Sequence, residues 1–191
     1  MDDAAGLAIA LEEAKLSYNE GGIPIGAALV SKDGTILGQG HNMRVQLGSP
    51  IHHVVTLLPL LWRIMPLHFF NFSNIILPNE FQGETSALYN SGRLPASAYA
   101  GSTMYTTLSP CDMCTGACLL YGISRVVIGE NRTFLGGEAY LKQRAVEVIV
   151  VDSKECHELM TQFITEKPDL WNEDIGVTER VHSKEAATKT T

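Results

Sequence analysis

Residues 109–114 read Ser-Pro-Cys-Asp-Met-Cys, and this stretch decides how the rest of the chain is interpreted. Pro110 suits the start of a helix because its missing N–H would be unpaired there, and Gly122 suits the helix end. Two thiols about one turn apart at the positive N-terminus of a helix are stabilised as thiolates, which bind zinc. A catalytic zinc needs one further protein ligand and a water, so the motif is incomplete by itself.

The missing groups are expected upstream, where Glu84 lies in the first turn of a second predicted helix. Zinc deaminases combine His-x-Glu with Pro-Cys-x-x-Cys, the glutamate serving as general acid and base. In this chain the first half reads Gln-Gly-Glu at residues 82–84. The glutamate is therefore in place, but the expected histidine is not.

The chain resembles the fungal-type cytosine deaminases of the cytidine deaminase superfamily. The resemblance covers nearly all of residues 4–53 and 83–176, whereas residues 54–82 match nothing in that family. The stretches that carry the resemblance are residues 20–26, 40–44, 105–116, 129–131 with Phe134, and 171–176.

The resemblance implies one Zn²⁺ per chain and hydrolytic deamination of cytosine to uracil and ammonia. The implied zinc ligands are His53, Cys111 and Cys114. Glu84 has the position of the proton shuttle, which is not itself a metal ligand. The third ligand stays open, because His52 adjoins His53 and Gln82 occupies the position that the motif gives to histidine.

The resemblance also implies a substrate pocket built from several parts of the chain. Asn42 and the backbone N–H of Gly83 would hold the pyrimidine, and Asp174 would accept from its exocyclic amine. Phe134 and Trp171 would close over the ring. Ser109 completes the predicted set of substrate-binding residues.

Residues 54–82 are dominated by apolar side chains, and two structural interpretations of them are weak. A transmembrane helix is disfavoured by Arg63, His68, Pro59 and Pro66. A loop of this length and apolar character, acting as a lid, would be unusual and would itself need to be covered.

We favour a third interpretation, in which residues 54–82 are a retained intron translated in frame. Every valine codon begins with GT, and Val54 opens the segment, while one of the two glutamine codons ends with AG, and Gln82 closes it. Removing these 29 residues preserves the reading frame and joins His53 to Gly83 and Glu84. That junction restores the missing His-x-Glu motif.

Composition bounds the classes of partner and the cellular compartment. The 191 residues carry 14 basic and 21 acidic side chains, a formal net charge of −7, with no basic cluster that could follow a phosphate backbone. We therefore expect a small pyrimidine base as substrate, with no nucleic acid and no membrane as partner. Four cysteines, two of them in Cys-x-x-Cys, and an acidic N-terminus without a signal-peptide pattern predict a reducing, cytoplasmic location. The nucleus is kept as a second location, and the resemblance implies a homodimer.

Hydrophobic periodicity predicts one α/β domain with helices on both faces of a central mixed sheet, in three α/β/α layers, as in cytidine deaminase-like proteins. The domain should span residues 1–176, interrupted by 54–82, and be followed by a disordered polar tail at 177–191. Helices are expected near 4–20, 84–91, 110–121, 137–144 and after Ser153, and strands near 26–30, 35–40, 104–108, 125–129 and 146–151.

Three functions compete on the sequence alone. The first is a cytosine deaminase of pyrimidine salvage, which residues 171–176 favour. The second is a deaminase of another small base or nucleoside, such as guanine or a riboflavin precursor. The third is an inactive or zinc-impaired protein, because glutamine is a poor substitute for a histidine ligand.

Overall fold

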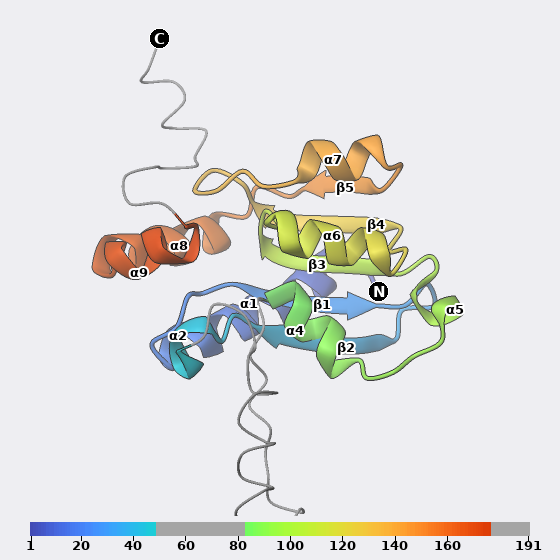
Figure 1. The fold of residues 1–191 in the computed structure, drawn as a ribbon, viewed down its shortest axis with the longest axis horizontal. Helices are drawn as coiled ribbons and strands as arrows, with labels where there is room; N and C mark the ends of the chain where they lie inside the picture. Colours follow the sequence, from blue (N-terminus) through green and yellow to red (C-terminus); the bar gives the residue numbers. More distant parts are fainter. Residues whose placement is uncertain (49–82, 177–191) are drawn as a thin grey trace, which may run out of the picture.

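The computed structural model describes residues 1–48 and 83–176, drawn in colour in Figure 1. The predictions for residues 54–82, the tail at 177–191, and the ligand candidates His52, His53 and Gln82 lie outside the described residues. The helices are α1 (Asp3–Asn19), α2 (Arg44–Leu47), α4 (Gly83–Asn90), α5 (Ala96–Tyr99), α6 (Asp112–Leu120), α7 (Glu138–Gln143), α8 (Lys154–Glu166) and α9 (Pro168–Asp174). The strands are β1 (Gly26–Val30), β2 (Ile36–His41), β3 (Thr103–Leu108), β4 (Arg125–Glu130) and β5 (Glu147–Val150).

The five strands form one mixed sheet in the order β2-β1-β3-β4-β5. Strand β1 runs antiparallel to both β2 and β3, while β3, β4 and β5 are parallel to one another. The predicted turn at residues 32–34 joins β1 to β2, and its Gly34 has φ +89°, a conformation that glycine adopts without steric cost. The prediction of a mixed central sheet is confirmed.

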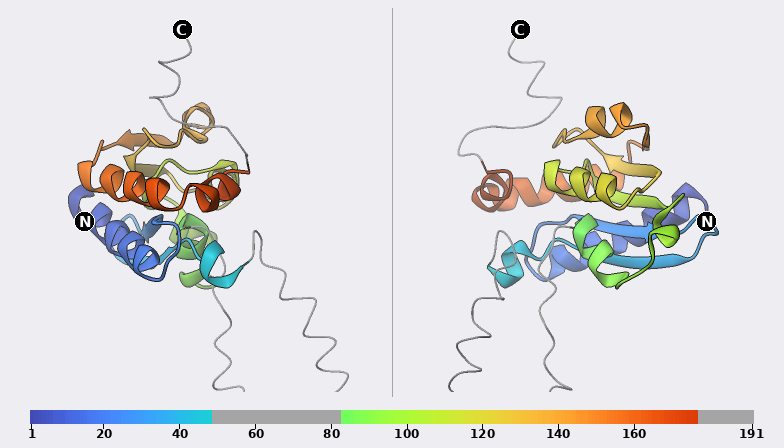
Figure 2. Two further views of the ribbon diagram at one scale, coloured as in Figure 1. Left: turned by 90° about the vertical axis from the view of Figure 1, so that its left-hand side faces the viewer. Right: turned by 45° about the vertical axis from the view of Figure 1, so that its right-hand side comes forward.

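Helices cover both faces of this sheet, which confirms the three-layer arrangement (Figure 2). Because side chains alternate along a strand, Ala28 and Val30 face α1 and α8, whereas Ala27 and Leu29 face α4, α6 and α7. No helix in residues 1–48 and 83–176 is long and apolar enough to cross a membrane.

Two glycines let the helices approach the sheet closely enough to position later side chains. A Cβ on Gly26 would lie 2.1 Å from the backbone oxygen of Ala10 in α1. A Cβ on Gly38 would lie 2.2 Å from the backbone oxygen of Ala87 in α4. Helix α4 therefore rests directly on the β2 backbone, which fixes the direction of its first turn.

A separate apolar cluster lies at the end of the sheet where β3 finishes. It joins Ile23 and Ile25, which precede β1, to residues of α8 and α9. Its buried members are Ile23, Ile25, Leu108, Met160, Phe163 and Trp171. This cluster seats α9 beside the residues that follow β3.

The structure adds two features to the C-terminal third. A nearly continuous apolar run such as residues 146–151 is typical of a strand buried on both faces, but β5 is an edge strand that pairs only with β4, and Val151 is 46% exposed. Pro168 follows the end of α8 and begins α9 at a first-turn position, where its missing N–H costs nothing.

Candidate active site

The Cys-x-x-Cys motif lies at the start of α6, a helix that begins two positions later than the sequence suggests. Cys111 is the N-cap residue and the helix begins at Asp112, so Pro110 precedes the helix instead of opening it. Cys114 lies in the first turn and is fully buried. Both thiols therefore point into the end of the sheet where β3 finishes.

The two motif thiols are close enough to share a hydrogen bond. This bond from Cys114 lowers the pKa of Cys111, while the same bond and complete burial hold the pKa of Cys114 well above its usual value. Cys118, one turn further along, is buried among apolar residues, and burial raises its pKa. Cys118 is thus a packing residue, as the sequence predicts.

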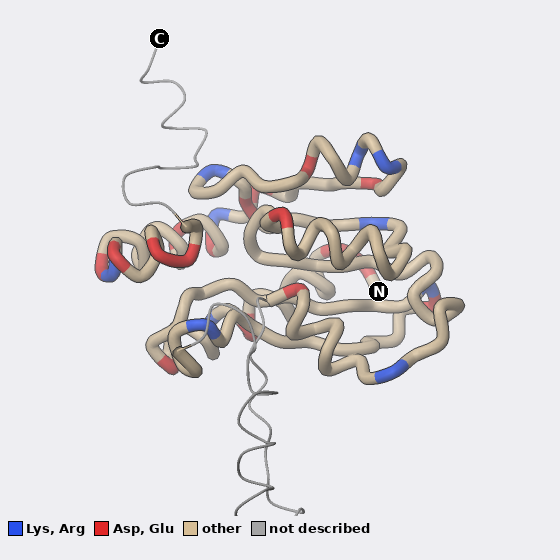
Figure 3. The backbone as a smooth tube through the Cα atoms, in the orientation of Figure 1, with Lys and Arg blue, Asp and Glu red and all other residues tan. Residues whose placement is uncertain are grey.

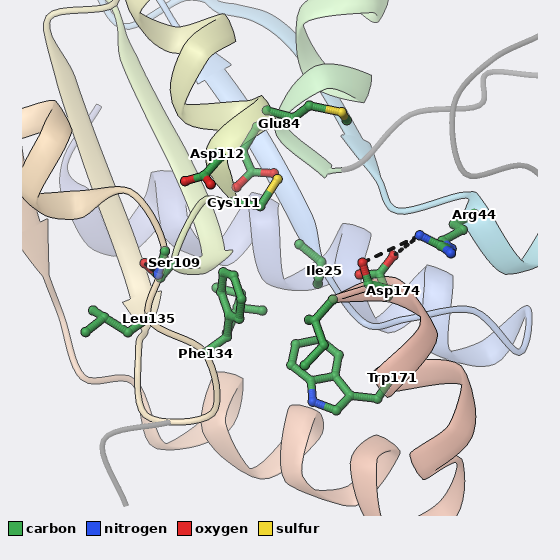
Figure 4. Close-up of a pocket in the computed structure, with 14 residues that line it drawn as sticks. Ile25, Arg44, Glu84, Ser109, Cys111, Asp112, Phe134, Leu135, Trp171 and Asp174 are labelled. Atoms are coloured by element: carbon green, nitrogen blue, oxygen red, sulfur yellow. Dashed lines mark hydrogen bonds and ion pairs between the residues drawn. The ribbon is translucent and has the colours of Figure 1, made fainter. Parts of the chain in front are cut away.

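Glu84 is 2% exposed in the first turn of α4 and faces the thiols across the site (Figure 4). Its Oε1 accepts a hydrogen bond of 3.0 Å from Thr106 Oγ1 in β3. Burial raises the pKa of Glu84, against the effect of hydrogen bonds that include one with Cys114. A buried carboxyl with a raised pKa can both take up and give back a proton near neutral pH.

The donor set that the structure describes suits part of a zinc site. Two thiols at a helix N-terminus fit the soft, four-coordinate preferences of Zn²⁺ and leave two positions for another protein ligand and a water. Within residues 1–48 and 83–176, no group of three or more His, Cys, Asp or Glu side chains is arranged to hold a metal.

A cavity of about 490 Å³ opens beside Glu84 and Cys111 (Figure 4). Four elements supply its walls: the first turn of α4, the start of α6, the loop before α7, and α9. Of the predicted site residues, those that line the cavity are Glu84, Ser109, Cys111, Phe134, Trp171 and Asp174. Gly83 is buried at the same end of the sheet, where an added Cβ would lie 3.1 Å from Ile25 O.

One end of the site presents an amide donor, Asn42, and a carboxylate acceptor, Asp174, which lie near each other. Asn42 is fully buried, its backbone N–H donates to Ile25 O at 2.8 Å, and its Oδ1 accepts from the backbone N–H of Arg44. Among the described residues, neither Asn42 Nδ2 nor Asp174 Oδ1 has a hydrogen-bond partner. Unpaired buried polar groups are costly, so a pair of them indicates a ligand that supplies the missing partners.

Asp174 holds its carboxylate at this end of the cavity. Its side chain is 4% exposed, and burial raises its pKa to about 6 although the guanidinium of Arg44, 3.6 Å away, opposes the shift. Arg44 also reaches the backbone oxygen of Asp174 and the carboxylate of Glu173. The chain segment after Asn42 is thereby tied to α9.

The apolar wall of the cavity consists of two aromatic rings from distant parts of the chain. Phe134 meets Trp171 edge to face, with ring centroids 6.1 Å apart and an interplanar angle of 88°. Trp171 is 3% exposed and is anchored in the apolar cluster at the end of the sheet. A flat aromatic ligand could stack between this wall and Ile25.

Sequence reasoning missed three polar residues of the site. Arg44 and Thr106 fall within the stretches that carry the family resemblance, but a lone arginine or threonine has no spacing pattern to mark it. Glu138, which accepts hydrogen bonds from Ser109 and Asn131, has no sequence signal beyond the two glycines before it. Each was found only through its contacts.

The comparisons with known proteins agree with this geometry. The sequence model of the cytidine and deoxycytidylate deaminase zinc-binding region matches residues 1–130. The chain is 50% identical over 175 residues to a cytosine deaminase of Candida albicans, which covers 92% of this chain and 97% of the relative. The chain therefore belongs to the cytidine and deoxycytidylate deaminase family, and within it the domain carries the zinc-binding region of hydrolytic deaminases.

More distant matches are also named as deaminases. A tRNA-specific adenosine deaminase of Streptococcus pyogenes is 29% identical over 153 residues, or 80% of this chain and 75% of the relative. A structure from a study of A-to-I editing by tRNA:A34 deaminases matches with a TM-score of 0.55 and 21% identity, covering 82% of this chain and 99% of that one. A guanine deaminase from Nitrosomonas europaea matches with a TM-score of 0.51 and 18% identity, covering 84% of each chain. These structural matches concern the fold alone.

Proposed function

We propose that this chain catalyses the zinc-dependent hydrolytic deamination of cytosine to uracil and ammonia. The observation that carries the proposal is the combination of a buried carboxyl, Glu84, beside the motif thiols with Asn42 Nδ2 and Asp174 Oδ1, neither of which makes a hydrogen bond to the described residues. Cytosine offers a carbonyl oxygen to the amide donor and an exocyclic amine to the carboxylate acceptor. The 50% identity to a cytosine deaminase supports the same substrate.

One Zn²⁺ per chain completes the site. Cys111 and Cys114 supply two ligands, and His53 is the proposed third. When bound, zinc lowers the pKa of a water molecule so that a strong nucleophile is available near neutral pH. Such a nucleophile would suit attack at C4 of the pyrimidine, the carbon that carries the amine.

Glu84 moves the protons that this addition and the loss of ammonia require. It takes one proton from the attacking water and passes it to ring N3; it then takes the second proton, from the hydroxyl added at C4, and passes it to the departing amine, which leaves as ammonia while the C4 carbonyl forms. The raised pKa of Glu84 suits this exchange, because a carboxyl with an unshifted pKa would hold a transferred proton poorly at neutral pH. Thr106 Oγ1 orients the carboxyl by donating to its Oε1.

The remaining site residues hold the base. Asn42 Nδ2 and the backbone N–H of Gly83 donate to the pyrimidine, and Asp174 accepts from its amine. Phe134 and Trp171 cover the ring. Ser109 borders the pocket beside the metal ligands.

Deaminases of other bases are the second candidate, because adenosine and guanine deaminases occur among the relatives and structural matches. Lys and Arg positions are scattered along the described part of the chain (Figure 3), and Arg44 is the one basic residue among those that line the cavity. With a formal net charge of −7, this distribution favours a free base over a tRNA substrate.

The test is product analysis with the zinc-loaded protein. Cytosine, cytidine, adenosine and guanine are supplied separately, and ammonia and the deaminated base are quantified. We expect equal amounts of ammonia and uracil from cytosine, and turnover of the other compounds lower by at least roughly 100-fold. Preference for guanine or adenosine would contradict the proposal.

We further propose that residues 54–82 interrupt a single deaminase domain and derive from a retained intron. Asn42, before the stretch, and Gly83, directly after it, both lie beside Ile25, whose backbone oxygen accepts from Asn42 N. This proximity supports the proposal that the two parts of the sequence belong to one domain. Transcript sequencing tests this: a dominant message that contains codons 54–82 contradicts it.

A homodimer that acts in pyrimidine salvage, in the cytoplasm and also the nucleus, is the proposed biological context. One face of α6 supports the dimer, because Met113 and Leu120 share it and are 47% and 80% exposed, with the exposed Gly116 between them. Apolar side chains around a glycine allow a second helix to approach closely. Light scattering of the parent and of Leu120→Asp tests this: the parent should be a dimer and the variant a monomer.

A further inference from the structure

We propose that Glu138 is a positioning residue that holds the aromatic wall of the pocket against the metal-binding motif. The proposal rests on the proposed function and adds a residue that touches neither substrate nor metal. Glu138 begins α7 and is 7% exposed. It lies between two segments that line the cavity, the motif residues before Cys111 and the loop at 131–137 that carries Phe134.

Hydrogen bonds to Glu138 join these segments. Its Oε1 accepts from Ser109 Oγ at 3.0 Å and from Asn131 Nδ2 at 2.7 Å. Ser109 Oγ in turn accepts from the backbone N–H of Gly136 at 3.0 Å. The loop is thus attached to one carboxylate near both of its ends, directly at Asn131 and through Ser109 at Gly136.

Backbone contacts make the attachment tight. The N–H of Gly137 donates to Pro110 O at 2.9 Å, and a Cβ on Gly136 would lie 2.0 Å from the same oxygen. The loop therefore packs on the motif with no room for a side chain at Gly136. Phe134, inside this loop, is held where its ring meets Trp171.

These contacts also change the interpretation of Ser109. Its hydroxyl has a single proton, which it donates to Glu138, and it accepts from Gly136 N. The hydroxyl therefore has no proton to offer the substrate. Replacing Ser109 would weaken substrate binding by releasing the loop, and this effect would resemble the loss of a direct contact.

Glu138 acts through the position of one oxygen atom, because both groups that donate to its Oε1 are neutral. Glutamine keeps a carbonyl oxygen at that position and can accept both hydrogen bonds. Alanine removes the acceptor and leaves two buried donors unpaired. The proposal thus predicts that Glu138→Gln and Glu138→Ala differ strongly, although each removes the same charge.

The experiment uses the form lacking residues 54–82, because the 191-residue chain is expected to give little or no product, and in this form Trp171 is the single tryptophan. In this background we compare Glu138→Ala, Glu138→Gln and Asp3→Ala. The last is a matched control, because Asp3 accepts two hydrogen bonds from Arg125, of 2.6 and 2.7 Å, at the opposite end of the sheet. Bound zinc, KM and kcat for cytosine, and the emission spectrum of Trp171 are measured.

Glu138→Ala should raise KM by roughly tenfold or more while kcat falls less than about threefold, because the pocket wall is displaced and the proton-transfer groups are not. Bound zinc should be unchanged and Trp171 emission should shift to longer wavelength. Glu138→Gln should stay within about twofold of the parent KM. Asp3→Ala should lose stability without changing KM or emission.

Three results would overturn the proposal: parent-like KM and emission in Glu138→Ala, equal damage from glutamine and alanine, or an equal KM rise in Asp3→Ala. If Glu138→Ala does not fold, Ser109→Ala decides by the same measurements, since it removes one of the two hydrogen bonds without removing a charge. If the parent does not deaminate cytosine, the proposed function fails, while the Trp171 emission of the variants still tests the role of Glu138.

Discussion

Glu84 is the residue whose replacement should separate chemistry from metal binding. Glu84→Gln keeps the size of the side chain and its contact with Thr106, and it leaves Cys111 and Cys114 intact. We expect kcat to fall by roughly 10²- to 10⁴-fold, the usual contribution of a general acid–base group, with one zinc still bound per chain. Rapid-quench turnover and metal analysis measure both; near-parent turnover would exclude Glu84 as the proton shuttle.

Protonation of Asp174 should weaken cytosine binding at low pH. Its raised pKa of about 6, caused by burial, means that the carboxylate that accepts from the amine becomes protonated as the pH falls below that value. KM for cytosine should therefore rise below about pH 6 and be flat above about pH 7. A KM profile of the parent across pH 5–8 measures this, and a KM that is unchanged at pH 5 would contradict the role.

The buried Asp174 carboxylate should also destabilise the folded state at neutral pH. A carboxyl whose folded-state pKa lies above the usual 3.8 stabilises the folded state only while it is protonated. Its contribution to the free energy of unfolding is therefore present below about pH 4 and is lost as the pH rises through 6. Asp174→Asn should stabilise the fold at pH 8 by about 1–3 kcal/mol, but not at pH 4, while impairing cytosine turnover. Urea unfolding at both pH values tests this, and Glu173→Gln, on an exposed neighbour, should change neither property.

At the scale of single residues, the sequence identified the groups that belong to a spaced motif. Cys111, Cys114 and Glu84 converge as predicted, because a Cys-x-x-Cys at a helix start and a glutamate in another first turn have few alternative arrangements. Arg44 and Glu138 could not be found in this way, since their roles come from contacts 130 and 29 residues away in sequence. Such contacts exist only once the sheet has brought α9, α7 and the motif to one end.

Helix α9 depends on an ion pair with the segment that precedes residue 48. Arg44 contacts Glu173, the carboxylate of Asp174 and its backbone oxygen, and so fixes the helix that carries Trp171. Arg44→Met keeps an apolar stem but removes the charge. We expect KM for cytosine to rise by roughly tenfold. The pH below which KM increases further should also be higher than in the parent, because Asp174 loses the cation that opposes its protonation.

The comparison variant for this prediction is Glu173→Gln. It removes only the exposed partner of Arg44, whose side chain is 68% exposed, and surface ion pairs of this kind contribute about 0–1 kcal/mol. Its KM and pH profile should match those of the parent. Identical behaviour of Arg44→Met and Glu173→Gln would show that Arg44 does not act on Asp174.

Elements long enough to show a repeating hydrophobic pattern were predictable from the sequence, whereas the shortest elements were not. Leu7, Ala10, Leu11 and Ala14 form the buried stripe expected of α1, and β1 to β4 fall within a residue or two of their predicted ranges. Helices α2 and α5 have four residues each, too few for a period to be visible. The apolar run of β5 indicated a buried strand, but strand order decides which strand lies at an edge, and order is a tertiary property.

For the whole molecule, the layer order followed from the alternation of helices and strands, whereas the position of the third zinc ligand did not. The motif thiols and Glu84 come together from two helices on the same face of the sheet, and Asn42 and Gly83 both lie beside Ile25. In the form without residues 54–82, the peptide link from His53 to Glu84 would hold the histidine beside the carboxyl. In the 191-residue chain that link is interrupted, and we expect poor solubility, because the segment adds many apolar side chains.

The most direct test measures ammonia and uracil released from cytosine by the form lacking residues 54–82, alongside the 191-residue chain, with bound zinc quantified in both. The account predicts one zinc per chain and equal amounts of ammonia and uracil from the shortened form, and little or no product from the longer one. Equal activity of the two forms would make residues 54–82 a tolerated part of the enzyme. A shortened form that binds zinc but releases neither ammonia nor uracil from cytosine would contradict the central claim.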